Sequence, residues 1–353
     1  PCIGSFMLPV TPRGPHPSIG VRLRRLLPAH VRRAGARMVS VRRASQVERQ
    51  LEALGRDGRP ILLGPWLGEV GFELLYWIPF LRWFAERYGV SPERLIAVSR
   101  GGAAAWYSAF ASRSHDALAF MSQEEFRLRN ADRTGRLGEQ KQVASTQLED
   151  DIIAVVRHHE QTALAVLHPS TMYRLFAPYW WGHRTIDWIH QYARFAPMRP
   201  PSLDVQLPAN YTAVKFYFND CFRNTPANRG FVDRTIRALS EEGPVISLST
   251  GVAVDDHVAC EPDVAAMHEI QHLLAPESNL AVQSAIVAGA RRFVGTYGGF
   301  AYLAPLCRVP AVSYYSEPGS FSIRHLDLMR DILHTSNDAG LLQLVQVPRE
   351  GGR

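Results

Sequence analysis

Lysine is nearly missing from this chain, although its formal net charge is +6. Only Lys141 and Lys215 are lysines, so arginine provides almost all of the positive charge. Residues 13–59 are especially basic, with twelve arginines and three acids. Such a segment attracts anionic lipid or the phosphates of nucleic acid, and a solvated arm is the alternative. No aromatic residue lies among these arginines to stack on bases, so we expect no nucleic-acid partner and keep an anionic membrane surface as a candidate.

Cysteine motifs and long apolar runs are also missing. The four cysteines form no C-x-x-C pair, which argues against a zinc ribbon or a redox pair and fits a reducing, cytoplasmic setting. The densest apolar run, residues 74–84, is interrupted by Pro79 and Arg82 and is too short to cross a bilayer. Residues 1–17 lack the basic and then apolar pattern of a signal peptide. We therefore expect a cytoplasmic protein, with any membrane association limited to the surface.

Metal-binding motifs are scarce as well. The chain has no D-x-D pair, which argues against transferases that hold a sugar nucleotide through a carboxylate-bound divalent metal. Residues 268–272, HEIQH, match the H-E-x-x-H pattern that places two zinc-binding histidines on one face of a helix. No third ligand is evident, and the stretch lies within an alternating α/β unit. We expect no metal and no cofactor, and keep a zinc metallohydrolase using His268 and His272 as a less favoured alternative.

Apolar segments alternate with helical segments in two parts of the chain. The first part has predicted strands at 59–66 and 94–102 and predicted helices at 72–88 and 103–111. The second has predicted strands at 211–218, 244–251, 291–299 and 310–317 and predicted helices at 228–243, 279–290 and 300–309. This alternation predicts parallel sheets covered by helices on both faces. At 353 residues the chain is long for one core, so we expect an α/β fold with two Rossmann-like domains facing a cleft.

Composition suggests where these domains begin and end. Residues 198–208 are rich in proline, lack periodicity and are typical of a linker. Residues 121–147 are polar and predict no regular element. The expected units are a basic arm at 1–58 with some helix near 45–54, a first Rossmann-like domain at 59–197, a linker at 198–208, and a second Rossmann-like domain at 209–353.

The glycine pair Gly298–Gly299 ends the predicted strand at 291–299. A helix follows immediately, and its N-terminus offers unpaired N–H groups and a positive dipole end to a phosphate or diphosphate. Each glycine or threonine taken singly is explained equally well by a turn or a helix cap. Together they favour a phosphate site at the carboxyl edge of the sheet. The candidates for this phosphate site are Thr250, Gly251, Thr296, Tyr297, Gly298 and Gly299.

Lys215 is a further candidate for this phosphate site. It lies in a mainly apolar strand, where a bare ammonium is costly to bury, so it must reach the end of the sheet or an anion. Arg223 and Arg229 follow in the next loop, and a phosphate-bearing ligand would supply the missing negative charge. Alternatively, Lys215 extends toward solvent or pairs with Asp220.

Two carboxylates follow the first predicted strand of the first Rossmann-like domain. Glu69 lies in a glycine turn, and Glu73 lies one helical turn later. A carboxylate near a helix N-terminus is stabilised there, which explains Glu73 better than Glu69. We name both as catalytic candidates and favour Glu69 as the general base for an acceptor hydroxyl. The acceptor-binding candidates are Gly68, Arg100, His168 and Trp181, although most aromatic residues near Trp181 fit a core equally well.

Two stretches of the sequence resemble the lipopolysaccharide heptosyltransferases. GEVGFELLYWIPFLRWFAERYGV is similar to that family's first loop and helix, where a G-D turn precedes a helix of the type x-x-x-P-x-L-R-x-x. NLAVQSAIVAGARRFVGTYGGFAYLAPLCRVPAVSYY is similar to its donor-side stretch, which contains D-T-G-x-x-H-L and then G-x-P-x-x-x-L. The resemblance covers both ends of the folded part and little of its middle.

The resemblance implies a GT-B glycosyltransferase that transfers a sugar from a nucleotide-sugar donor to a glycan or lipid-linked acceptor. Residues 59–197 would then form its acceptor-side domain, and residues 209–353, with the phosphate-site candidates, its donor-binding domain. Glu69 then takes the place of the family's proposed aspartate base, and Gln283 lies on the donor side. Tyr297 and Tyr302 replace the aspartate and histidine of the donor motif, so the resemblance does not single out ADP-heptose. Hexosyl-, heptosyl- and fucosyltransferase-like enzymes all fit, and a GT-B-like binding protein without catalysis is the alternative class.

Overall fold

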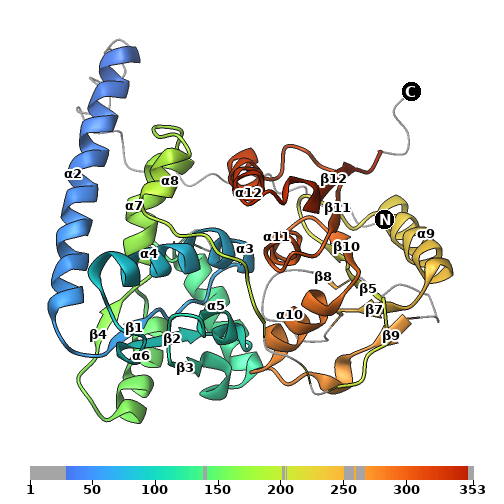
Figure 1. The fold of residues 1–353 in the computed structure, drawn as a ribbon, viewed down its shortest axis with the longest axis horizontal. Helices are drawn as coiled ribbons and strands as arrows, with labels where there is room; N and C mark the ends of the chain where they lie inside the picture. Colours follow the sequence, from blue (N-terminus) through green and yellow to red (C-terminus); the bar gives the residue numbers. More distant parts are fainter. Residues whose placement is uncertain are drawn as a thin grey trace, which may run out of the picture.

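Two parallel β-sheets organise the chain, one in each part where strands and helices alternate (Figure 1). The computed structural model describes residues 29–137, 141–200, 203, 205–249, 258–259 and 267–348. The first sheet has the order β3-β2-β1-β4, and the second has the order β12-β11-β10-β5-β7-β9. Every strand pairing within these two sheets is parallel. The predicted α/β fold with two parallel sheets is therefore confirmed.

The strands are short. Those of the first sheet are β1 (Ile61–Leu63), β2 (Leu95–Ser99), β3 (Arg113–Asp116) and β4 (Ala165–Leu167). Those of the second are β5 (Thr212–Lys215), β7 (Val245–Ser247), β9 (Met267–Glu269), β10 (Arg292–Thr296), β11 (Ala311–Tyr315) and β12 (Leu342–Gln346). A small antiparallel pair, β6 (Tyr217–Phe218) with β8 (Val258–Ala259), adjoins them.

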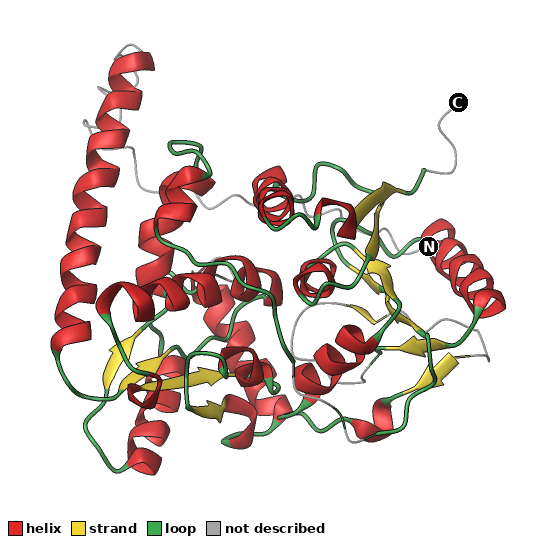
Figure 2. Cartoon of the chain, in the orientation of Figure 1, coloured by secondary structure: helices red, strands yellow, loops and turns green. Residues whose placement is uncertain are grey.

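Helices cover both faces of each sheet (Figure 2). Those of the first part are α2 (Ala29–Arg56), α3 (Val70–Phe72), α4 (Ile78–Tyr88), α5 (Gln123–Leu137), α6 (Gln147–Glu160), α7 (Ser170–Trp180) and α8 (Asp187–Gln191). Those of the second are α9 (Pro226–Glu242), α10 (Asn279–Gly289), α11 (Gly299–Leu306) and α12 (Ile323–Thr335). In β1, Leu62 packs in a cluster with residues of α5 and α6, whereas Ile61 and Leu63 belong to the cluster that contains α4. Because successive strand residues point to opposite faces, both faces must be apolar, as the sequence has them.

The predicted helix over 72–88 is interrupted. The structure divides it into α3, a π-helical turn at Glu73–Trp77, and α4. Pro79 lies in the first turn of α4 and has no amide hydrogen to continue the regular bonding ladder. The wider turn just before it, closed by the bond from Ile78 N to Glu73 O, accommodates this loss. Gly89, with φ of 61°, ends α4 in a left-handed conformation.

Other expectations need correction. The polar segment 121–147 was expected to be irregular, but most of it forms α5, and residues 103–107 form a 3-10 helix rather than the longer predicted helix. The helix expected near 45–54 extends over all of α2, and its buried residues Ala44, Val47 and Leu51 belong to the core. Figure 1 shows α2 beside α7, with one end projecting past the neighbouring helices. The elements β3, β12 and α12 were not predicted.

The two parts of the chain are in direct contact. Trp106 Nε1 donates to Ser284 Oγ on α10 at 2.9 Å, and Met198 N donates to Leu306 O on α11 at 2.8 Å. The predicted linker therefore packs on the second part where it leaves the first. The domain bounds themselves stay a prediction.

Candidate functional site

The glycine turn that follows β1 meets the glycine turn that follows β10. A Cβ added to Gly299 would lie 2.8 Å from the Val70 side chain and 3.0 Å from Gly71 N, so only glycine allows this approach. Gly71 in turn faces the Tyr302 ring, 3.5 Å from an added Cβ. The contact places α3 against α11, as Figure 1 shows. Glu69 directly precedes α3 and is therefore held close to the N-terminus of α11.

Glu69 is the exposed carboxylate of this junction. It occupies the N-cap position of α3 in an extended conformation, and its side chain makes no capping hydrogen bond. Its main-chain oxygen accepts a hydrogen bond from Glu73 N at 3.1 Å. The carboxylate is thus presented at the surface of the turn by the main chain.

Glu73 is completely buried. Its carboxylate accepts hydrogen bonds from Ser99 Oγ at 2.7 Å and Tyr107 OH at 2.6 Å, and it pairs with Arg100 Nη1 at 3.2 Å. Burial raises the pKa of Glu73, and the charge of Arg100 and the two hydroxyl donors oppose that rise. With its oxygens used inside the core, Glu73 fixes the π-helical turn to the end of β2 and does not face an acceptor in this conformation.

Arg100 and Gly68, both predicted to bind the acceptor, belong to the same buried network. Arg100 is 7% exposed and also donates through Nη2 to the Gly68 main-chain oxygen. The guanidinium therefore stabilises the turn from inside, next to Glu73. In the structure, the polar atoms of both residues hold the turn itself.

Gln142 clamps the same turn from the segment before α6. Its side-chain oxygen accepts from Leu67 N at 2.8 Å, and its amide donates to Pro65 O at 2.9 Å and to Glu149 Oε1 at 3.1 Å. Gln142 is fully buried. Sequence analysis missed it, because a glutamine in an irregular polar segment carries no local signal of such a role.

On the second side, the structure brings two predicted donor-binding residues together. Lys215, at the end of β5, contacts Gln283 Oε1 of α10 through its ammonium group, and its Nζ lies 4.2 Å from the centre of the Phe300 ring. Gln283 is fully buried and donates to Asn279 Oδ1 at 2.6 Å. A cation at the carboxyl end of the central strand, beside α11, is consistent with an anionic ligand at this edge.

The side chains of the predicted β10 motif turn inward. Thr296 Oγ1 donates to Tyr217 O at 2.8 Å and accepts from Tyr217 N at 3.1 Å, which joins β10 to β6. The Tyr297 hydroxyl bonds the Tyr302 hydroxyl, and burial raises the pKa of Tyr297 to about 12. An added Cβ at Gly298 would lie 1.8 Å from Tyr217 OH. These side chains are therefore used inside the protein, and Lys215 is the predicted cation at this edge.

The remaining predicted residues lie elsewhere. Arg223 is 65% exposed, with Nε 4.0 Å from Glu317 Oε1. His168 is half-buried at the end of β4, its Nδ1 lies 3.1 Å from Ser170 N, and burial lowers its pKa. Trp181, just after α7, is 64% exposed. Thr250 and Gly251 lie outside the described residues.

His325 is a residue of this junction that sequence analysis missed. It comes from α12, and its Nδ1 lies 2.6 Å from Tyr76 OH in the π-helical turn. The His325 ring centre lies 4.7 Å from the Phe72 ring centre, and Lys141 Nζ lies 5.8 Å from the Phe72 ring centre. Burial, and to a lesser extent the charge of Lys141, lowers the pKa of His325 to about 4. Because α12 was not predicted, nothing in the local pattern pointed to this histidine.

The stretch HEIQH is not a helix. His268 lies in β9 and His272 in the 3-10 turn Gln271–Leu273, so the expected helical spacing is wrong. Both side chains are exposed. Over the described ranges, no group of three His, Cys, Asp or Glu residues is placed to hold a metal ion.

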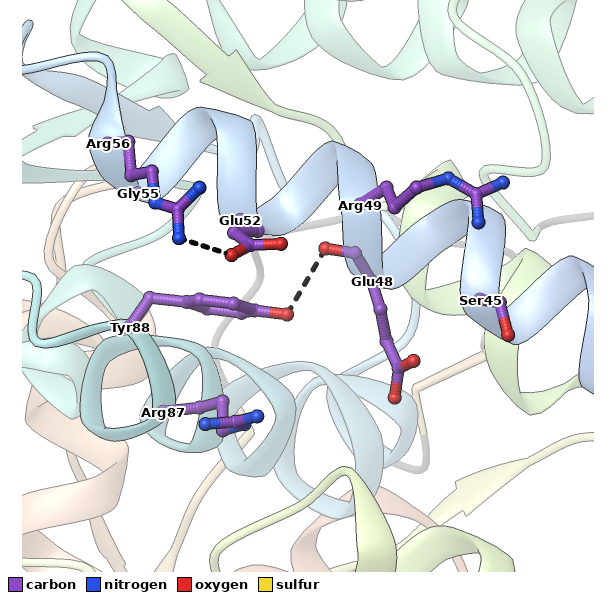
Figure 3. Close-up of a pocket in the computed structure, with 8 residues that line it drawn as sticks. All are labelled: Ser45, Glu48, Arg49, Glu52, Gly55, Arg56, Arg87 and Tyr88. Carbon is purple, nitrogen blue, oxygen red and sulfur yellow. Dashed lines mark hydrogen bonds and ion pairs between the residues drawn. The ribbon is translucent and has the colours of Figure 1, made fainter.

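A polar groove of about 540 Å³ lies away from this junction, between α2 and the end of α4 (Figure 3). Within it, Tyr88 OH donates to Glu48 O at 3.2 Å and Arg56 pairs with Glu52 at 2.6 Å. Its lining residues are Ser45, Glu48, Arg49, Glu52, Gly55, Arg56, Arg87 and Tyr88. None of the predicted site residues lines it.

Among the helices of the described residues, none is long and apolar enough to span a bilayer.

No protein-family model and no curated protein sequence matches the chain. Among solved structures, it is similar to the bacterial iron-containing dodecameric glycosyltransferase TibC from enterotoxigenic E. coli H10407 (11% identity, TM-score 0.39, 73% of this chain and 58% of TibC). It is also similar to E. coli heptosyltransferase WaaC with ADP (12%, TM-score 0.37, 80% and 99%) and to the glycosyltransferase SnogD from Streptomyces nogalater (10%, TM-score 0.35, 82% and 86%). The chain thus spans less than two thirds of TibC.

Proposed function

We propose that this chain is a glycosyltransferase of GT-B-like fold, which moves a sugar from a nucleotide-sugar donor to a glycan or glycolipid acceptor. One observation carries the proposal: the Gly71–Gly299 contact holds the exposed Glu69 beside the N-terminus of α11. These two turns are also the two stretches that resemble the heptosyltransferases. An acidic residue and a phosphate-binding helix end are what transfer from a nucleotide-sugar requires at one place.

The proposed mechanism needs no metal. Glu69 takes the proton of an acceptor hydroxyl as that oxygen forms a bond to the anomeric carbon. The bond from that carbon to the diphosphate breaks, and the nucleoside diphosphate leaves with the electron pair. Lys215 and the N-terminal end of α11 stabilise the negative charge on the leaving group. Glu73, Arg100 and Gln142 act by keeping the turn in place.

A donor screen tests the proposal. Nucleotide sugars that carry a hexose, a heptose or fucose are added to the full chain, and thermal unfolding is recorded. A true donor present at 100 times its dissociation constant should add about 2.7 kcal/mol to the free energy of unfolding. Transfer or slow hydrolysis of that donor should then be detected by release of nucleoside diphosphate. If no nucleotide sugar stabilises the protein, the proposed function is wrong.

A binding protein without catalysis is the second candidate. It is favoured by one observation: Tyr297 and Tyr302 stand where the resemblance has aspartate and histidine, and their hydroxyls bond each other inside the core. Stabilisation by a nucleotide sugar without any turnover would support this candidate over the enzyme.

We also propose that α2 contacts anionic membrane lipid. Arg42, Arg49 and Arg56 are exposed and repeat every seven residues, so they form one stripe with steps of about 10.5 Å. Arginines near an anionic surface each contribute about 1 kcal/mol, less at high salt. The protein should sediment with phosphatidylglycerol vesicles and not with phosphatidylcholine vesicles. Changing the three arginines to glutamine should weaken this binding, whereas Arg234→Gln with Arg237→Gln on α9 should leave it unchanged.

A further inference from the structure

Lys141 and His325 both contact one aromatic ring, although they come from different parts of the chain. Lys141 precedes α6 in the first part, and His325 lies on α12 in the second. Their distances to the centre of the Phe72 ring are 5.8 Å from Lys141 Nζ and 4.7 Å from the centre of the His325 ring. Phe72 is only three residues after Glu69. The pair therefore lies beside the proposed catalytic turn, on a ring other than the Phe300 ring that Lys215 covers.

The contact with Tyr76 orients the histidine. Burial raises the pKa of Tyr76 well above its ordinary value, so the phenol keeps its proton and can donate it to His325 Nδ1, 2.6 Å away. The ring hydrogen then lies on Nε2. His325 and Lys141 are both half-buried and so remain in contact with solvent. A neutral imidazole with an N–H donor and an ammonium group thus both contact the Phe72 ring.

We propose that Lys141 and His325 bind a phosphoryl oxygen of a substrate, as an anion site additional to Lys215. The two groups offer an ammonium charge and an N–H donor, the combination that binds phosphate strongly in a partly desolvated place. The surrounding elements also carry Glu69, Glu73 and Tyr76 in and before the π-helical turn, and Arg324, Asp327, Arg330, Asp331 and His334 on α12. The site itself is independent of the proposed function, but its identification with a substrate phosphate rests on that function.

The phosphate can belong to the nucleotide-sugar donor or to a phosphate-bearing acceptor. Two arms of one experiment separate these sources. Binding of inorganic pyrophosphate and of ADP, GDP and UDP is measured by calorimetry, with the wild-type protein and with a Lys215→Met background. Pyrophosphate binding is then repeated at saturating nucleoside diphosphate. The background removes the other lysine, so that the remaining affinity reports on the Lys141 site.

The variants are chosen in matched pairs. Lys141→Met keeps the apolar stem on Phe72 and should weaken pyrophosphate binding by about tenfold or more, whereas Lys141→Arg should retain most of it. His325→Asn can still accept from Tyr76, but its short amide NH₂ group does not reach the position of Nε2, so it should weaken binding, and His325→Gln, whose amide nitrogen reaches further, should weaken it less. Arg87→Met, on the remote side of α4, should bind like the wild type. Melting temperatures confirm that each variant is folded.

The histidine itself gives a second readout. In the NMR titration of the wild type, pyrophosphate should raise the pKa of His325 from its low value near 4, because a bound anion favours the imidazolium. This rise should be smaller in Lys141→Met, a difference that a merely structural lysine would not produce.

The outcomes are distinct. Loss of nucleoside diphosphate binding in Lys141→Met assigns the site to the donor. Loss of only the pyrophosphate bound at saturating nucleoside diphosphate assigns it to an acceptor phosphate. Equal pyrophosphate affinity in wild type and Lys141→Met, or no binding to either, overturns the proposal. That result leaves the proposed function standing if a nucleotide sugar still turns over, so the two failures can be told apart.

Discussion

The strongest test of the site compares Glu69→Gln with Glu73→Gln. The two carboxylates lie four residues apart, but one is exposed at the turn and the other is fully buried. The same chemical change should therefore lower mainly the reaction rate at Glu69 and mainly the free energy of unfolding at Glu73.

Glu69→Gln keeps the size of the side chain and removes its basicity. The loss of a general base lowers a rate by about 10²–10⁴-fold. Because Glu69 is exposed and does not cap α3 through its side chain, the free energy of unfolding should change by less than about 0.5 kcal/mol. Donor affinity should also stay near the wild-type value, since the base contacts the acceptor.

Glu73→Gln should act on stability. An amide can still accept from Ser99 and Tyr107, but its NH₂ group would face the Arg100 guanidinium, which is 7% exposed. Arg100 would then keep only the Gly68 oxygen as a partner among the contacts described above. Breaking a buried ion pair in this way costs about 3–5 kcal/mol. Urea unfolding should show this loss, while turnover per folded molecule should fall less than in Glu69→Gln.

Both variants are measured in parallel for turnover with the donor found by the screen, for donor affinity, and for urea unfolding. The reasoning is refuted if Glu69→Gln turns over like the wild type while Glu73→Gln is folded and inactive, because the roles are then exchanged. If neither change affects turnover, the base lies elsewhere, and His168 is the next residue to test.

Four further predictions follow from the contacts. Lys215→Ala should weaken donor binding by about 1.5–3 kcal/mol, seen by calorimetry, and unchanged affinity would contradict its phosphate role. EDTA should leave transfer activity intact, whereas loss of activity that zinc or manganese restores would favour a metal mechanism. Gly299→Ala should lower the melting temperature and turnover together, because a Cβ there would lie 2.8 Å from Val70; an unchanged variant would show that the two turns can separate freely. The folded pKa of His325 is about 4 against an ordinary 6.5, so the unfolded chain takes up the proton first as pH falls. The free energy of unfolding should therefore decrease from about pH 6.5 to pH 4, and His325→Asn should flatten this slope in pH-dependent urea unfolding.

Local patterns predicted four strands of the second part, β5, β7, β10 and β11, and three of its helices, α9, α10 and α11, but not β9, β12 or α12. The segments around β5, β7, β10 and β11 are short, apolar and bounded by glycine or proline, and such runs become parallel strands wherever helices cover both faces. The polar segment that forms α5 escaped prediction, since few of its residues are apolar and its helix is stabilised mainly by packing of Phe126 in the core.

The site divides in the same way. The sequence by itself determined that two glycine turns follow β1 and β10, that Glu69 lies in the first, and that Lys215 lies in a mainly apolar strand, because glycine, charge and apolar periodicity are local properties. Only the tertiary structure decided which polar groups are used up. Glu73 finds Ser99 and Tyr107 at separations of 26 and 34 residues, and His325 finds Tyr76 at 249. Such pairings depend on how whole elements pack, and burial then decides whether a carboxylate or a histidine is held inside the core or presented to a ligand.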